Sequence, residues 1–225
     1  MVIMENKIVY IVGAYKGQEF KYLLEEGYSI VAIEANPYFC KLLKEKFSKY
    51  ISDGKVNIIN KAIAEGDTTN LYLSKHEDWC STHKKIANRV EALDSIIQVE
   101  CANLQDIINQ HLIPYYLRID IEGNDAMAVG QLKCKPLYIS CESECVGDGN
   151  DKKTEEEILK VLYSLKNKGY TKFKIVSGYE YDIKSVVEEF TSDKWMSFED
   201  CKKYLLTESP KYETFTFWKD ILATY

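Results

Sequence analysis

The sequence is poor in the residues that build metal sites from nitrogen and sulfur ligands. It has three histidines among 225 residues, and its seven cysteines are scattered without a Cys-x-x-Cys pair. None of the histidines has zinc-ligand spacing to a cysteine. We therefore expect reduced thiols that pack as small apolar groups, and neither a zinc site nor a disulfide framework.

Long apolar runs and an excess of positive charge are also absent. No run approaches the roughly 18 residues of a membrane-spanning helix, and the first residues resemble neither a signal peptide nor an Arg-rich transit peptide. The net charge of −6 disfavours nucleic acid as a partner, because phosphate contacts need a basic face. We expect a cytoplasmic protein without a membrane segment, and the sequence leaves its oligomeric state open.

What the sequence does contain is an alternation of strand-like and helix-like segments, which is typical of an α/β domain with a parallel sheet. No linker or internal repeat divides it, so we expect one domain over residues 1–225. The predicted strands are Lys7–Gly13, Ser29–Ala35, Val56–Ile63, Asn70–Ser74, Ser95–Cys101, Tyr115–Ile121, Pro136–Cys141, Thr171–Ser177 and Tyr212–Trp218. The predicted helices are Gln18–Glu26, a helix that starts at Asn36-Pro37, Leu104–His111 and Lys152–Lys168.

A glycine pair and an acid follow the first two predicted strands. Gly13 and Gly17 allow a tight turn and a close approach of a ligand to the backbone, and the carboxylate of Glu34 can accept bonds from ribose hydroxyls. A nicotinamide cofactor would need the Gly-x-Gly-x-x-Gly spacing, which is missing. A ligand with a ribose and no phosphate fits better, and S-adenosylmethionine is such a ligand. A tight turn without any ligand is the plain alternative.

Acids on alternate residues follow two later strands. Asp120 and Glu122 would share a general-base role or hold a divalent cation such as Mg²⁺, or else serve as the N-cap and first-turn acid of a following helix. Glu142 and Glu144 repeat this spacing after the next strand. If the strands are neighbours, four acids crowd one rim, which favours a cation or a polyhydroxyl substrate. A solvated acidic edge is an equal alternative for the second pair.

Four segments, in order, resemble the motifs of the FkbM-type S-adenosylmethionine-dependent methyltransferases. The family's first motif is close to Asp-Val-Gly-Ala-Asn-x-Gly-Gln, the second to Ala-Phe-Glu-Pro-Asn-Pro, the third to Asn-x-Ala-Leu-Gly-Asp and the fourth to Leu-Lys-Ile-Asp-x-Glu-Gly. The matching segments here are Ile11–Gln18, Ala32–Pro37, Asn60–Glu65 and Leu117–Gly123. The serine-bearing loop that the family often carries has a counterpart in Cys80-Ser81-Thr82.

The resemblance implies a fold and a chemistry. The fold is the class I methyltransferase (Rossmann-like) fold, a seven-stranded mostly parallel sheet with helices on both faces and a last antiparallel strand, which Tyr212–Trp218 could supply. The chemistry is transfer of the methyl group of S-adenosylmethionine to a hydroxyl of a sugar, a glycan or a related small molecule. The residues carried over for cofactor binding are Gly13, Ala14, Gly17, Glu34, Ala35, Asn36, Ala62, Ile63 and Asp120.

Two departures from the family pattern matter. Ile11 stands where the family usually has Asp, and Tyr15 stands where it usually has Asn. The missing acid would normally help to organise the methionine end of the cofactor.

We assign the acceptor chemistry to a few side chains. Asp120 or Glu122 is the expected base, directly or through a cation that they would hold with Glu142, and His83 is a further candidate base. With little chain before the first strand, acceptor recognition is expected from segments His76–Leu93 and Tyr181–Lys211. The candidate acceptor contacts are Trp79, Ser81, Glu142, Glu144 and Trp195.

Other functions compete with this interpretation. A nicotinamide oxidoreductase is disfavoured by the glycine spacing, and a nucleic-acid methyltransferase by the net charge. A catalytically silent module that kept the fold for binding or assembly stays an alternative because of Ile11.

Overall fold

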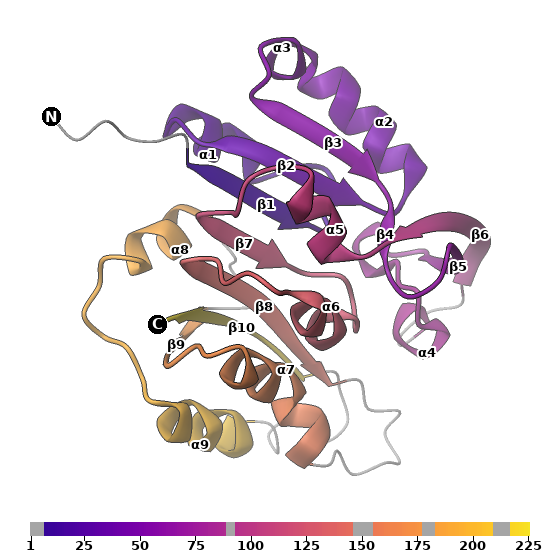
Figure 1. Cartoon of the computed structure of the whole chain (residues 1–225). Coiled ribbons are helices and arrows are strands. Elements are labelled where there is room, and N and C mark those ends of the chain that lie inside the picture. The colour runs from indigo at the N-terminus through magenta and orange to yellow at the C-terminus, as the bar shows by residue number, and fades with distance from the viewer. Residues whose placement is uncertain (1–6, 89–92, 146–154, 177–182, 209–216) are drawn as a thin grey trace, which may run out of the picture.

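Seven strands form the central sheet of the computed structural model, which describes residues 7–88, 93–145, 155–176, 183–208 and 217–225 (Figure 1). Their order is β3-β2-β1-β7-β8-β10-β9. β10 is antiparallel to both of its neighbours, while every other pairing in this sheet is parallel. The bounds are β1 Ile8–Val12, β2 Ser29–Glu34, β3 Val56–Asn60, β7 Tyr116–Ile119, β8 Tyr138–Cys145, β9 Lys172–Val176 and β10 Phe217–Thr224.

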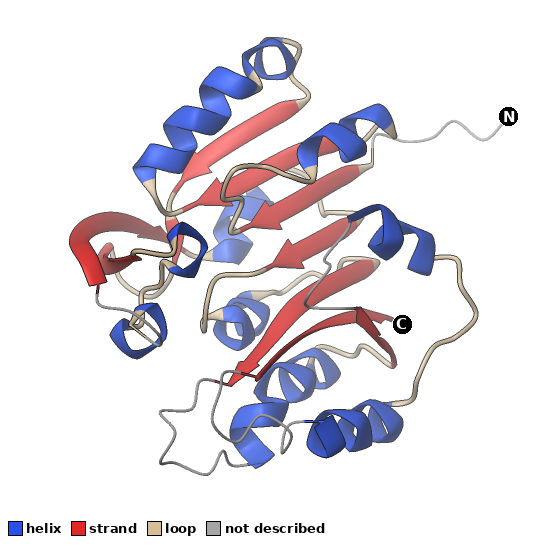
Figure 2. Cartoon of the chain, turned by 180° about the vertical axis from the view of Figure 1, so that it is seen from behind, coloured by secondary structure: helices blue, strands red, loops and turns tan. Residues whose placement is uncertain are grey.

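Helices cover both faces of this sheet (Figures 1 and 2). Successive side chains of a strand point to opposite faces, so Tyr10 and Val12 pack on one apolar core and Val9 and Ile11 on the other. The first core includes side chains of α5 Leu104–Asn109, α6 Asp125–Gln131, α7 Glu155–Asn167 and α9 Phe198–Glu208. The second includes side chains of α1 Phe20–Glu25, α2 Pro37–Lys46, α3 Ser48–Ser52 and α8 Ile183–Glu189.

A smaller sheet stands beside the end of β3. Its order is β4-β6-β5, and a one-turn helix and a short α-helix follow β5. The bounds are β4 Ala62–Ile63, β5 Thr68–Ser74, η1 Glu77–Trp79, α4 Lys84–Ala87 and β6 Leu93–Ala102. The predicted strand Val56–Ile63 is therefore two strands, because the chain leaves the large sheet at Lys61 and pairs with β6.

The start of α2 is as the sequence predicts. The Asn36 side chain caps the helix by accepting a hydrogen bond from the Tyr38 N–H at 3.0 Å, and Pro37 occupies the first helical position. No helix of the described residues is long and apolar enough to cross a membrane.

The C-terminal third departs from the prediction. Segment Tyr181–Lys211, predicted to be weakly patterned, contains α8 and α9, each with apolar side chains three or four residues apart. The last strand begins at Phe217 and runs to Thr224, whereas residues 212–216 lie outside the described part of the chain. Its centre, Ile221 to Ala223, is buried and wholly apolar, so the alternation that predicted a strand at Tyr212–Trp218 gave no sign that the strand continues to Thr224.

Candidate functional site

The carboxyl ends of β1, β2 and β7 meet where the strand order reverses, which is the usual place for a ligand in an open α/β sheet. Gly13 follows β1 there with a φ of +87°. A Cβ at this position would lie 1.8 Å from the carbonyl oxygen of Asp120. A side chain is therefore excluded by the end of β7 itself.

Gly17, the second glycine of the turn, is required by packing. It has a φ of +63°, and a Cβ there would lie 2.7 Å from Cδ2 of Leu43 on α2. Between the two glycines, Ala14 is buried and Tyr15 adopts a left-handed φ of +46°. The conformation of the turn is thus fixed by packing against the protein interior, at Ala14 and Gly17.

Glu34 ends β2 and holds the glycine turn to that strand. Its carboxylate accepts hydrogen bonds from the Tyr15 N–H at 2.8 Å and the Asn36 N–H at 2.7 Å. Burial raises the pKa of the Glu34 carboxyl, and these two donors oppose that rise. A carboxylate has about four lone-pair sites, so Glu34 keeps acceptor capacity for a ligand.

Ala62 and Ile63, two of the predicted cofactor-binding residues, follow Asn60, which contacts the end of β2. The Asn60 side-chain amide donates to the carbonyl oxygens of Glu34 and Ala35, at 2.9 and 3.0 Å. Ala62 and Ile63 are both buried on β4, and Ala62 packs in the same small apolar cluster as Ala35.

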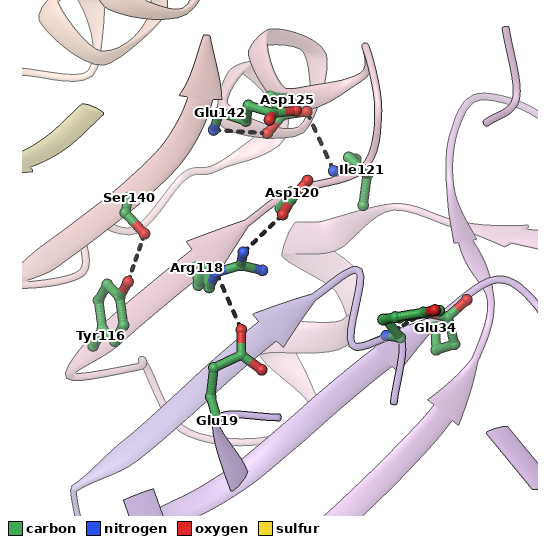
Figure 3. A network of polar contacts seen from close by, with 10 residues as sticks. Glu19, Glu34, Tyr116, Arg118, Asp120, Ile121, Asp125, Ser140 and Glu142 are labelled. Carbon is green, nitrogen blue, oxygen red and sulfur yellow. Dashed lines mark hydrogen bonds and ion pairs between the residues drawn. The ribbon is translucent and has the colours of Figure 1, made fainter. Parts of the chain in front are cut away.

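Three of the predicted acids lie together at this edge, and Figure 3 shows two of them, Asp120 and Glu142. Asp120 and Glu122 come after β7, which ends at Ile119, and Glu142 lies on the neighbouring strand β8. One ligand oxygen from each of the three lies within 4.8 Å of the others. At Glu144 the structure describes the backbone alone, so the fourth predicted acid has no described side chain.

Asp125 is a buried acid at the same edge that the sequence analysis missed. Its carboxylate accepts from the Ile121 N–H at 3.4 Å and the Glu142 N–H at 3.2 Å, which ties the ends of β7 and β8 together. Burial, with the nearby charge of Asp120, raises the pKa of Asp125 well above its usual range. Asp125 is the first-turn acid of α6, so Asp120 and Glu122 do not have the helix-capping role considered for them.

A second missed group surrounds Arg118 on β7 (Figure 3). The guanidinium is buried, with Nη2 2.7 Å from Oδ2 of Asp120 and Nε 3.4 Å from Oε1 of Glu19. Asp220 on β10 is also buried, and desolvation raises the pKa of its carboxyl to about 7, opposed by the charge of Arg118. Arg118 and Asp120 belong to one motif segment, but no local motif marks Glu19 and Asp220, which are far from it in the sequence.

The loop after β5 reaches the acids through hydrogen bonds. Ser81 is buried and donates to the Glu122 carbonyl oxygen at 2.7 Å. Nε2 of His83 lies 2.6 Å from Oδ1 of Asn124, just after Gly123. The structure thus brings Ser81 and His83 to the edge that holds Asp120 and Glu122.

The two tryptophans proposed to contact the acceptor lie apart. Trp79, in η1, packs against the His76 ring at 4.2 Å between ring centres. Trp195 stacks with Tyr138 and lies under Nζ of Lys174, 4.2 Å from the ring centre. It lines a cavity of about 440 Å³ with Lys172, at the end of the sheet where β9 begins. The structure therefore does not bring Trp195 to the edge that holds Glu34 and the acids.

Comparisons with solved structures agree with the fold. A geranyl diphosphate methyltransferase in complex with S-adenosylmethionine has a TM-score of 0.50 at 7% identity, over 97% of this chain and 78% of that one. A precorrin-6y C5,15-methyltransferase from Geobacter metallireducens GS-15 has a TM-score of 0.43 at 10% identity, over 99% and 81%. Identities this low show the fold alone, and the fold is that of class I methyltransferases.

Comparison with protein families gives a more specific result. No curated protein sequence matches this chain. The methyltransferase FkbM domain, by contrast, matches residues 12–172, which include the glycine turn, Glu34, the acids after β7 and the acids on β8. Because that match spans more than half of the sequence, the chain belongs to the FkbM methyltransferase domain family.

Proposed function

We propose that the chain is an S-adenosylmethionine-dependent O-methyltransferase that acts on a hydroxyl of a sugar, a glycan or a related small molecule. The observation that carries this proposal is the group of carboxylates formed by Asp120, Glu122 and Glu142 beside the turn at Gly13. An acceptor hydroxyl is weakly acidic, and a carboxylate with nearby like charges is a suitable base for it.

The residues at the strand ends fit the cofactor. Glu34 has acceptor capacity for ribose hydroxyls, and the bare backbone at Gly13 allows a ligand to approach closely. Gly17 and Ala14 shape the same turn. The remaining residues assigned to the cofactor are Ala35, Asn36, Ala62 and Ile63, beside Glu34, and Asp120.

When bound, S-adenosylmethionine supplies a methyl carbon that the acceptor oxygen attacks, while the carbon–sulfur bond breaks and its electron pair stays on sulfur. Asp120 or Glu122 takes the proton from the acceptor hydroxyl as the new carbon–oxygen bond forms. Their fixed positions at the end of β7 orient the acceptor for in-line attack. His83, held by Asn124, is a second candidate for the proton.

The same acids suit a divalent cation. Asp120, Glu122 and Glu142 offer oxygen ligands alone, which is the donor set that Mg²⁺ prefers. These three residues would hold such an ion.

Acceptor contacts are proposed from the loop after β5 and from β8. Trp79 offers an aromatic face to a sugar ring, while Ser81, Glu142 and Glu144 offer polar groups. We also propose a cytoplasmic location, because the six cysteines with described side chains are free thiols, as in a reducing compartment.

The test begins with calorimetric titration of the purified chain with S-adenosylmethionine and with NAD. A panel of saccharides and small hydroxyl compounds is then incubated with the cofactor, with and without EDTA, and methylated products are detected by mass spectrometry. Binding of S-adenosylmethionine and an O-methylated product are expected. If the chain does not bind this cofactor at millimolar concentration, the proposal is wrong and a catalytically silent module replaces it.

Replacing Glu122 with Gln tests the base. We expect Glu122→Gln to lower turnover at least ~100-fold, because general-base catalysis contributes about that much. Cofactor affinity should stay within about twofold, since Gln keeps the size of the side chain. Glu65→Gln, at an exposed turn, is the control. Undiminished turnover in Glu122→Gln would remove Glu122 from the mechanism.

A further inference from the structure

The buried group around Arg118 lies next to the position where the family's acid is missing. Ile11 is fully buried and pairs in register with Arg118 on the neighbouring strand. Side chains of paired residues in parallel strands lie side by side on one face of the sheet. An acid at position 11 would therefore stand beside the Arg118 guanidinium, where this chain has an apolar side chain.

Glu19 restores a carboxylate to this place from another element. It is the residue before α1, two positions after Gly17, and its side chain is 10% exposed. Its Oε1 lies 3.4 Å from Nε of Arg118, on the side of the guanidinium away from the Asp120 contact (Figure 3). In this chain a carboxylate therefore reaches Arg118 from the turn that leads into α1, and not from the first strand.

Asp220 adds a further carboxylate from the last strand. Ile119 pairs with Cys141 and Asp220 pairs with Glu142, so Asp220 lies on the same face of the sheet as Asp120. Asp220 is 7% exposed and accepts no hydrogen bond from the part of the chain that the structure describes. Buried carboxylates normally have partners, so this one is available to a ligand.

The charges of the group do not balance. Two carboxylates, those of Glu19 and Asp120, pair with the single guanidinium of Arg118, which already leaves one negative charge in excess. Asp220 adds a further negative charge when it is ionised, and Lys219 weakly opposes that charge. Excess negative charge in a buried place favours a bound cation, because the attraction between opposite charges is weakly screened there. The group lies next to Asp120, whose carbonyl oxygen touches Gly13.

We propose that Glu19 and Asp220 bind the α-ammonium group of S-adenosylmethionine, in place of the acid that this chain lacks at Ile11. The inference rests on the proposed function, because it assigns a subsite for that cofactor. An ammonium group has three N–H donors, and two carboxylates beside Asp120 can accept them.

The test compares three ligands by calorimetric titration of the full chain. S-Adenosylmethionine has the ammonium and a positively charged sulfur, S-adenosylhomocysteine has the ammonium without the charged sulfur, and 5′-methylthioadenosine has neither. We expect Glu19→Gln to lower the affinity for S-adenosylmethionine and for S-adenosylhomocysteine about tenfold each, which is typical of losing one charge-assisted hydrogen bond. The affinity for 5′-methylthioadenosine should fall less than about twofold. Asp220→Asn should give the same pattern. Glu25→Gln, on the exposed side of α1, is the matched control and should change none of them.

A carboxylate placed at position 11 should restore the cofactor affinity that Glu19→Gln loses. The double variant Ile11→Asp with Glu19→Gln returns a carboxylate to the side of Arg118 and should recover most of the lost affinity. Thermal melting checks that each variant is folded. If Glu19→Gln does not fold, Asp220→Asn alone decides the question with the same three ligands.

The outcomes separate the inference from the proposed function. Equal weakening of all three ligands, weakening of S-adenosylmethionine alone, or no weakening in either single variant would overturn the inference and leave the proposed function standing. A wild-type chain that binds none of the three would overturn the proposed function, and the inference with it.

Discussion

At the scale of single residues, the candidate site depends on positions that accept almost no alternative. Gly13 is the strictest, because its φ is left-handed and its missing side chain makes room for the Asp120 carbonyl oxygen. Its role was predicted from the sequence as a tight turn and a close approach to a ligand. The structure shows that the approaching group includes the chain's own backbone.

Gly13→Ala should lower the free energy of unfolding by about 3 kcal/mol or more, because both the left-handed φ and the clash at 1.8 Å act against it. Gly54→Ala is the control. Gly54 also has a positive φ, of +69°, but nothing lies within 4 Å of an added Cβ, so about 1 kcal/mol is expected. Urea denaturation followed by circular dichroism measures both. Equal losses in the two variants would contradict the role assigned to the clash.

Asp220 is a residue whose burial opposes folding. Desolvation raises its pKa from 3.8 to about 7, so the folded state holds a proton that the unfolded state has already released between these values. Stability that depends on this group is therefore present at low pH and lost as pH rises toward 7. We expect Asp220→Asn to be more stable than the wild type by about 2 kcal/mol at pH 8, with the gain vanishing near pH 4. Denaturation midpoints of both proteins across this range are the measurement, and a gain that grows toward low pH would contradict it.

At the scale of elements, the sequence predicted best where local chemistry and tertiary structure agree. The start of α2 follows from Asn36 and Pro37 alone, since capping is a contact between near neighbours in the chain. The extension of β10 beyond Trp218 was not predicted, because its buried centre has no period-2 alternation. α8 and α9 were missed because each buries only two apolar side chains, Ile183 and Val186 in α8 and Cys201 and Leu205 in α9, which is too few to show the helical period.

Removal of the α2 cap should lower the free energy of unfolding by a measurable amount. Asn36→Ala leaves the Tyr38 N–H without the acceptor that it has at 3.0 Å, and we expect a loss of about 1 kcal/mol. Asn103→Ala removes the equivalent cap of α5, where Asn103 accepts from the Gln105 N–H at 2.9 Å, and should cost a similar amount. Chemical denaturation compares the two. A larger loss of S-adenosylmethionine affinity in Asn36→Ala than in Asn103→Ala would show that the first cap also orders the site.

At the scale of the whole molecule, the sequence located one half of the candidate site and missed the other. Gly13, Glu34 and Asp120 follow strands in segments with recognisable motifs, so their meeting could be predicted from the rule for parallel sheets. Arg118 belongs to one of those motifs, but Glu19 comes from the turn before α1 and Asp220 from β10. Their meeting depends on strand order and register, which no local pattern encodes.

The position of β10 has a consequence for the order in which the protein assembles. β9 joins the large sheet through β10 and is not hydrogen-bonded to β8, so residues 172–176 have no strand partner in that sheet until residues 217–224 arrive. During synthesis on the ribosome, the half of the sheet with Gly13 and Glu34 can form before β10 is available to pair with β9. Asp220 belongs to β10, so the negative charge beside Arg118 is complete only after β10 has been synthesised.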